Sequence, residues 1–435
     1  MKPLSNFVIR HSKLALFGFV GLVLLSLIGG LQAFGNLKAG GYEDRGSQSQ
    51  QVMNILKDEF KQTDPEVVII ADTGRSLDDV QSENSAQLIT DALVNTKGVK
   101  TVSSYYTLGK PETLKSKDGT AFYIFVKLDD DVKAAAVADD IQNNIGGNHF
   151  GATVYVAGWA PITTEINHTI ESDLIRAEAI AVPLTLLLMI FVFGSIVAAG
   201  LPLLIAALSI LGSFFFVWLS SLFTDTSTFS VNLITGMGLG LGIDYALLMV
   251  NRFREEREKG LTVSEAVEKT MLSAGRTVFF SGMTVVLVMV SFGFFPQYFL
   301  RSFGLAGVVS VSIAVLAAII ALPALFNLLG DKVNKWPLFR HRPAKDVGFW
   351  DKLARVVMQR PVVVLLTTTI ALGSLAALGL DVKLGQVDDR ILPKDNKVVL
   401  ATNQIRDRFD GREGSPVEIL VPKESNKDVI QFAKT

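Results

Sequence analysis

Seven long apolar runs set the strongest limit on what this 435-residue chain can fold into. Each has about the 17–25 residues that a helix needs to cross the hydrocarbon core of a membrane. Inside a bilayer every backbone polar group needs an internal partner, so runs of this length become helices. The runs are Leu14–Leu31, Ala177–Phe193, Leu201–Leu222, Phe229–Val250, Val278–Phe295, Phe303–Leu329 and Val362–Leu380. We therefore predict a polytopic α-helical membrane protein with seven spans.

Basic residues in the connecting segments predict the orientation in the membrane. Segments 251–276 and 330–361 carry six and eight Lys or Arg residues. The short loops on the opposite side carry one, Arg301. The distribution predicts a multi-pass protein of the cell (plasma) membrane with a cytoplasmic N-terminus, and it puts residues 32–174 outside the cytoplasm.

The segment 32–174 has the pattern of a soluble α+β domain. Its apolar periodicity predicts helices at Gln48–Phe60, Leu77–Thr96 and Val132–Ile145, and strands at Glu66–Ala71, Val99–Thr107, Ala121–Leu128 and Thr153–Ala157. Without the first helix the order is β-α-β-β-α-β, which is typical of the split βαβ, or ferredoxin-like, fold. Its excess of acidic residues disfavours a nucleic-acid partner.

The opening of the chain recurs near its end. A helix ending "KDEF" followed by "DPEVVIIAD" returns as one ending "IRDRF" followed by "SPVEILVP", and Phe60 and Phe409 are 349 positions apart. A repeat of this length predicts that the chain is a fragment of a protein of roughly 700 residues, built from two six-span halves. We expect the missing second half to be a partner of the chain.

The runs and the repeat together predict six segments. They are the N-terminal flank and first span (1–31), the extracytoplasmic α+β domain (32–174), spans two to six (175–330), a cytoplasmic linker (331–361), the seventh span (362–380) and the truncated start of a second extracytoplasmic domain (381–435).

One carboxylate, Asp244, interrupts the fourth apolar run. A charged side chain near the centre of a bilayer costs about 2.5–3.5 kcal/mol even on the most lenient scale. Gly236 and Gly240 precede Asp244 at four-residue intervals, so the three share one helix face, where small residues allow another helix to approach closely. The pattern predicts close helix packing at both glycines and a carboxylate that faces protein.

A carboxylate withdrawn from water, with no Lys or Arg in the spans to pair with it, can take up and release a proton. Tyr245 can donate or accept a hydrogen bond beside it. These features predict a role in proton coupling; the alternative is a protonated Asp that only holds helices together. The glycines of "GMGLGLGIDY" follow no strand and precede no Lys-Ser/Thr pair, so they match no nucleotide-binding loop. Proton-motive force is then the expected energy source, with no cofactor besides the protons.

No group of residues predicts an enzyme or a metal site. The chain has no cysteine, and His11, His149, His168 and His341 are scattered without metal-ligand spacing. The outer segment shows no grouping of nucleophile and base.

With these motifs the chain resembles the MmpL (mycobacterial membrane protein large) family of the RND transporter superfamily. The matching stretches include "GYEDRGSQSQ", "RAEAIAVPLTLLLMIFVFGSIVAAGLPL", "GLGLGIDYALLMVNRFREE", "EAVEKTMLSAGRTVFFSGMTV" and "FFPQYFLRSFGLAGVVSV". The resemblance implies an RND-type membrane protein whose outer α+β segment is a porter domain. It also implies a transporter, driven by proton-motive force, that exports lipids or glycolipids across the plasma membrane for assembly of the cell envelope.

The resemblance also implies roles for single residues. Asp244 and Tyr245 match the proton-relay pair of the family, and a second pair would face them from the missing half. Ser281 matches a small polar position that faces the relay. Met237, Leu241 and Leu248 match positions that line the substrate or inhibitor pocket beside it.

Two stretches, "GSQSQ" and "DDRILPKDN", look most like the family members that move trehalose monomycolate, which implies a glycolipid substrate and membrane-lipid contacts. Homo-oligomers and cell-envelope assembly proteins are further partners that the resemblance suggests. The alternatives are a drug-efflux pump of the same superfamily and a non-transporting membrane scaffold or sensor.

Overall fold

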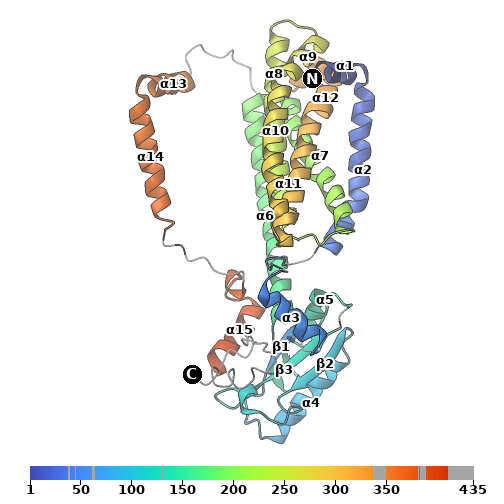
Figure 1. The fold of residues 1–435 in the computed structure, drawn as a ribbon, viewed down its shortest axis with the longest axis vertical. Coiled ribbons are helices and arrows are strands. Elements are labelled where there is room, and N and C mark those ends of the chain that lie inside the picture. Colours follow the sequence, from blue (N-terminus) through green and yellow to red (C-terminus); the bar gives the residue numbers. More distant parts are fainter. Residues whose placement is uncertain are drawn as a thin grey trace.

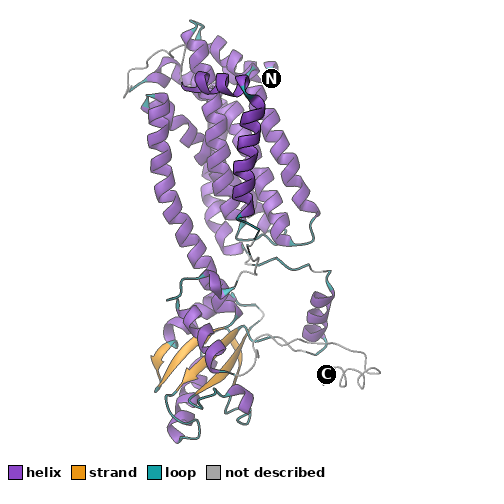
Figure 2. Ribbon diagram, turned by 90° about the vertical axis from the view of Figure 1, so that its left-hand side faces the viewer, coloured by secondary structure: helices purple, strands orange, loops and turns teal. Residues whose placement is uncertain are grey.

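The computed structural model describes residues 1–37, 40–44, 46–60, 64–129, 131–336, 349–380, 382 and 388–409. Figure 1 shows a bundle of long helices with a smaller unit at one end of it. All the strands that the structure describes lie in that smaller unit (Figure 2).

The bundle holds the first six apolar runs of the sequence. Its long helices are α2 (Ser12–Asn36), α6 (Trp159–Phe193), α7 (Ile196–Ser221), α8 (Ser230–Glu258), α10 (Ala274–Ser291) and α11 (Tyr298–Leu316). Among the described residues five helical stretches are long and apolar enough to cross a membrane, or up to seven if each of two bent pairs is one span. The prediction of a polytopic membrane protein is confirmed, and the count of seven spans stays a prediction.

The two bent pairs include the first and the last apolar runs. Helix α1 (Lys2–Arg10) meets α2 at 88° and packs on α9 (Val263–Leu272). Helix α13 (Phe349–Gln359) meets α14 (Pro361–Ala377) at 100°. Figure 1 shows α14 apart from the bundle, and none of its residues is buried. An apolar helix in this state depends on lipid or on another protein surface to cover it.

The sixth predicted span, Phe303–Leu329, is not one regular helix. After α11 the chain forms a π-helical turn, Ala317–Ala321, and continues as α12 (Leu322–Leu329). Pro323 has no backbone N–H to donate to the preceding turn, and a π turn accommodates such a defect with one extra residue. The sequence identified the apolar run but not this change of pitch.

Helix α7 lies at the centre of the bundle, where it packs against α2, α6, α8 and α11. Its first turn is fixed by Ser195, whose hydroxyl lies within hydrogen-bonding distance of the carbonyl oxygens of Val333 and Lys335 (3.1 and 2.8 Å). At the same end of the bundle the rings of Phe253 and Phe326 stack at 4.4 Å and 6°. These contacts join helices far apart in sequence into one packed core.

The smaller unit is a five-stranded antiparallel sheet with the order β2-β3-β1-β5-β4. The strands are β1 (Val67–Asp72), β2 (Val99–Ser104), β3 (Ala121–Leu128), β4 (Gly147–His149) and β5 (Ala152–Ala157). Helices α4 (Val80–Val94) and α5 (Ala134–Asn144) bury Ile89 and Ile141 in the same core as the sheet. A short 3-10 turn, Glu112–Leu114, precedes β3.

The predicted strands and helices of this unit are confirmed to within a few residues, and their order is that of the split βαβ fold. Only β4 was not predicted, because three residues are too few to show an alternating pattern. Helix α3 (Gln48–Asp58) is present as expected but buries none of its residues. That this unit acts as a porter domain stays a prediction.

The chain returns to this sheet near its end. A 3-10 turn, Asp389–Ile391, leads into α15 (Lys397–Arg408), which packs on β1 and β5. Phe409 is buried and its ring lies 4.1 Å from that of Tyr123. The segment 381–435 was predicted to begin a second domain, and this stays a prediction. In its described part the segment packs on the first domain, where Ala401 and Phe409 are buried in the core of the sheet unit. The strand expected in "SPVEILVP" lies outside the described residues.

Charge pairing fixes this contact. Arg408 pairs with Asp72 at 2.6 Å and with Asp118 at 2.8 Å. Burial by itself would raise the pKa of the Asp118 carboxyl. Hydrogen bonds from the Ser116 hydroxyl (2.6 Å) and from Thr120, together with Arg408, outweigh burial and hold that pKa well below its usual range.

Candidate functional site

Helix α8 carries the Asp244 motif and packs tightly on α7 through two glycines. A Cβ atom at Gly238 would lie 2.7 Å from Ile210 Cγ1, and one at Gly242 would lie 2.7 Å from the Cα atom of Ala206. Such distances leave no room for any side chain. The two backbones therefore approach as closely as small residues allow in membrane helices.

On the opposite face of α8, no described residue packs against the glycines. A Cβ atom added at Gly236 or Gly240 would meet no neighbouring atom within 4 Å, and Asp244 is exposed. Residues two apart on a helix are about 200° apart, so the glycines that pack on α7 lie opposite those that share a face with Asp244. Among the described residues the close packing occurs at Gly238 and Gly242, and packing at Gly236 and Gly240 stays a prediction. Among the described residues the carboxylate does not face protein as expected.

Tyr245 lies inside the bundle beside Asp244. Its side chain is 3% exposed, and its hydroxyl forms no hydrogen bond of normal geometry with any described residue. The Ser281 side chain on α10 and the Asp244 carboxylate lie within electrostatic range of that hydroxyl. A buried donor without a partner loses the hydrogen bonds that water would give it, which costs about 1–3 kcal/mol. Such groups are retained where they have a function or bind water.

Gly282 allows α10 to pack closely on α11 beside this hydroxyl. A Cβ atom there would lie 2.2 Å from Val315 Cγ2 and 3.6 Å from Tyr245 Oη. The glycine therefore lets α11 and the tyrosine meet α10 at one point. Ser281, next to it, is exposed on the outer side of α10. Tyr245 on α8 and Ser281 on α10 thus lie near each other, and their role as a relay stays a prediction.

The predicted pocket residues divide between two environments. Met237 and Leu241 are half-buried and pack against the core of the bundle, whereas Leu248 is 40% exposed on the Asp244 face. Their role beside the relay stays a prediction.

The end of α8 after Asp244 is anchored by charges. Arg252 pairs with the buried Glu256 at 2.7 Å, and Arg254 donates to the carbonyl oxygen of Phe193 at the end of α6 (2.9 Å). Asp244 precedes Arg252 by eight residues, or about 12 Å along the helix axis. The carboxylate thus lies well inside the apolar part of α8, and the end of this helix is held by contacts with α6.

No group of three or more His, Asp or Glu side chains that could hold a metal ion occurs among the described residues. Sequence reasoning missed Gly282, Gly238 and Gly242 as packing positions. The signal for Gly282 was its place in "FFSGM" beside Ser281, and the signal for the other two was a second four-residue glycine spacing in "GMGLGLG".

Comparison with known proteins supplies the family. The MMPL family model matches residues 42–364. A putative membrane protein of Streptomyces coelicolor is 38% identical over 70% of the chain and 44% of its own length. The trehalose monomycolate exporter MmpL3 of Mycobacterium tuberculosis is 28% identical over 97% of the chain and 48% of its own length.

A third relative, the mycolic acid-containing lipids exporter MmpL11 of Mycolicibacterium smegmatis, is 26% identical over 100% of the chain and 46% of its own length. The chain thus spans about half the length of the curated relatives it matches. The family match includes the outer sheet, the whole of α8 and the Asp244 motif. The chain belongs to the MMPL family of the RND superfamily.

Proposed function

We propose that the protein is part of a proton-coupled exporter that moves lipids or glycolipids across the plasma membrane. One observation carries the proposal: an ionisable carboxylate on a bare, glycine-lined face of a membrane helix, next to a buried tyrosine hydroxyl that has no hydrogen-bond partner among the described residues. A lipid-exposed Asp would cost about 2.5–3.5 kcal/mol, so this face belongs against protein or water rather than lipid.

The carboxylate of Asp244 takes up a proton and releases it on the other side of the membrane in this mechanism. The hydroxyls of Tyr245 and Ser281 orient the carboxylate and pass the proton. Gly236 and Gly240 allow a second helical bundle to pack against the Asp244 face, with Leu248 at the same contact. Protons are the coupling ion, and no resident cofactor takes part.

The orientation follows the basic loops. The N-terminus, α9 and the start of α13 lie in the cytoplasm, and the sheet unit lies outside, where it acts as the porter domain. The names of two relatives, a trehalose monomycolate exporter and an exporter of mycolic acid-containing lipids, support a glycolipid as the cargo. A second bundle, and other cell-envelope proteins, are the proposed partners.

The test is complementation of a host strain depleted of its own copy, with the complete gene carrying Asp244→Asn. We expect normal protein levels and build-up of one lipid on the inner side of the membrane. The matched control is Asp173→Asn, which removes an exposed carboxylate from the outer part of α6. A normal lipid profile with Asp244→Asn, or resistance to drugs as the only phenotype, would refute lipid export coupled through this residue.

Tyr245→Phe separates function from stability. The hydroxyl makes no hydrogen bond with a described residue, so its removal should leave thermal stability unchanged or slightly higher. We expect export to fall all the same. If export is normal in this variant, the tyrosine is a packing residue and takes no part in proton transfer.

A further inference from the structure

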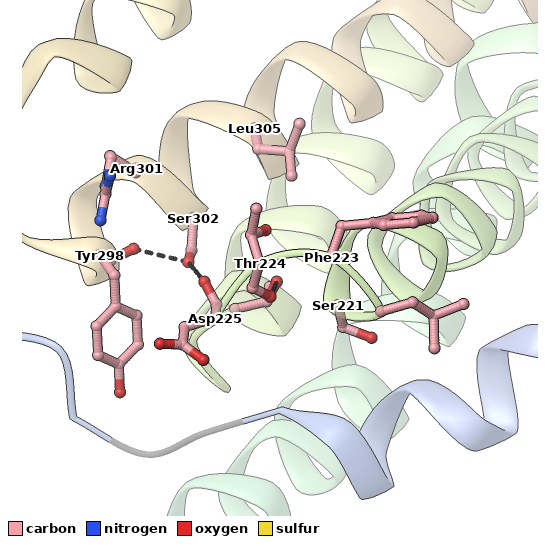
Figure 3. Close-up of a pocket in the computed structure, with 10 residues that line it drawn as sticks. Ser221, Phe223, Thr224, Asp225, Tyr298, Arg301, Ser302 and Leu305 are labelled. Carbon is pink, nitrogen blue, oxygen red and sulfur yellow. Dashed lines mark hydrogen bonds between the residues drawn. The ribbon is translucent and has the colours of Figure 1, made fainter.

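A large polar cavity of the bundle lies far from Asp244, between the end of α7 and the start of α11. Its volume is about 660 Å³, and it is open to the surface on one side. In Figure 3 the residues after α7 form one wall, and Tyr298, Arg301 and Ser302 form the other. Both helices belong to stretches that can cross a membrane, so the cavity opens at the membrane surface on the side of the sheet unit. Its volume is in the range of pockets that hold small molecules.

Hydrogen bonds hold the hydroxyl groups of the wall in place. Ser302 Oγ donates to the carbonyl oxygen of Tyr298 at 2.7 Å and accepts from the backbone N–H of Ser227 at 3.0 Å. The hydroxyls of Ser221 and Thr224 donate to carbonyl oxygens of the preceding turn at 2.7 and 3.2 Å. The wall is thus held by the chain's own backbone.

This arrangement favours a ligand that donates hydrogen bonds. A hydroxyl has one proton and two lone pairs, so Ser221 and Thr224, whose protons point to backbone oxygens, offer only acceptors to the cavity. The Asp225 carboxylate also lines the cavity. A phosphodiester group has no proton to donate at neutral pH, so it cannot donate to these acceptors. A sugar, with several hydroxyl protons, matches this wall.

Arg301 supplies the donors on the opposite side. It lies in the first turn of α11 and forms no ion pair with any residue that the structure describes. Its guanidinium can donate to hydroxyl or ring oxygens of a sugar. The rings of Tyr298 and Phe223 line the same cavity and offer flat apolar surfaces.

The rim of the cavity is apolar where it meets the membrane. Leu222 and Phe223 follow the last residue of α7, and Phe223 is 80% exposed. Leu305, on α11, is also exposed at the rim. A polar cavity beside exposed apolar side chains at a membrane surface matches a molecule with a polar head and a hydrocarbon chain.

We propose that this cavity binds the sugar headgroup of a lipid, with Asp225 and Arg301 on opposite sides of the sugar and the hydrocarbon chain along Leu222, Phe223 and Leu305. The site rests on the proposed function for the direction of lipid movement, but not for binding itself. It is the place where a glycolipid enters or leaves the bundle at the outer surface.

The test uses the whole chain in lipid nanodiscs and a dodecyl maltoside that carries a photoreactive diazirine on its alkyl chain. Labelled peptides are mapped by mass spectrometry. We expect labelling within residues 221–226 and 298–305, and competition by unlabelled dodecyl maltoside. Dodecyl phosphocholine, with the same chain length and no sugar, should compete about ten-fold less well, as expected for the loss of a charged hydrogen bond.

Two variants address the headgroup contacts separately. Arg301→Gln and Asp225→Asn should each weaken labelling of these peptides about ten-fold. Arg176→Gln and Asp173→Asn, which change the same residue types on the exposed outer part of α6, should not. Thr224→Val, which keeps the shape of the side chain, gives a further weakened variant if Arg301→Gln disturbs insertion.

The outcomes distinguish this site from the proposed function. Asp244→Asn should bind the probe normally and fail only in export. If the two detergents compete equally, or if Arg301→Gln and Asp225→Asn label like the α6 controls, the cavity is a nonspecific lipid-facing groove and the inference is wrong. Proton-coupled export through Asp244 would be unaffected by that result.

Discussion

The two glycine faces of α8 allow a matched pair of substitutions, and the structure predicts how far the two variants differ in stability. Gly242→Ala would place a methyl carbon 2.7 Å from the Cα atom of Ala206, whereas Gly240→Ala meets nothing within 4 Å. Carbon atoms in contact prefer about 3.5–4.0 Å. The atom in the way at position 242 belongs to the backbone of α7, so relief requires the two helices to move apart by about 1 Å.

The expected difference in stability follows from two opposing effects of the added methyl group. Replacing a helical glycine by alanine contributes about 0.5–1 kcal/mol to helix stability at either position. Overpacking at a helix contact costs about 1–3 kcal/mol, and only Gly242→Ala incurs it. The helix term cancels between the variants, so Gly242→Ala should be less stable than Gly240→Ala by about 1–3 kcal/mol.

The assay is the apparent Tm of the purified chain in nanodiscs, recorded at one scan rate because membrane proteins often unfold irreversibly. A change of 1 kcal/mol moves Tm by roughly 2–4 °C in domains of 150–250 residues, which gives a readable gap. Gly238→Ala should behave like Gly242→Ala, because Ile210 lies 2.7 Å from its Cβ position. Equal Tm values at 240 and 242, or a lower Tm for Gly240→Ala, would refute this assignment of the two faces.

Two further predictions concern the ends of the molecule. Phe326→Ala removes a fully buried ring stacked on Phe253 and should cost about 3–5 kcal/mol, measured as a loss of Tm with Phe7→Ala, an exposed ring near the same end, as the control. The pKa of Asp118 is lower in the folded protein than in the unfolded chain, so its contribution to stability is present above about pH 4 and is lost as pH falls below that value. The protection factors of β3 amides in the whole chain, corrected for the intrinsic pH dependence of amide exchange, should therefore fall on acidification, and fall less in Ser116→Ala. An equal fall in both proteins would contradict this origin.

The sequence predicted the membrane class and most of the elements because their causes are local. Apolar runs of spanning length can only become helices in lipid, and the outer strands alternate with a period of two, so Ala121–Leu128 was found to the residue. It failed where the pattern was too short or the cause was a distant contact. Three residues are too few for β4 to show alternation, and α15 packs on β1 and β5, which lie far from it in the sequence.

The candidate site shows the same division. The pattern of "GMGLGLGIDY" marked Asp244 and Tyr245, and one glycine every fourth residue indicated a close helix contact. It could not say which of two such glycine rows faces α7, since both rows have the same spacing. The choice of Gly238 and Gly242 required the positions of Ala206 and Ile210, on a neighbouring helix.

By itself the sequence determined that the chain spans a membrane, that it carries a split βαβ unit, and that one carboxylate lies in an apolar helix. Those properties follow from the composition and the apolar periodicity of single segments, so each can be read from one segment alone. Only the tertiary structure decided that Tyr245 Oη is buried with no hydrogen-bond partner among the described residues, that the Asp244 face is bare there, and that α15 returns to the first sheet. Each of these depends on which surfaces meet, and surfaces from distant segments meet only in the folded molecule.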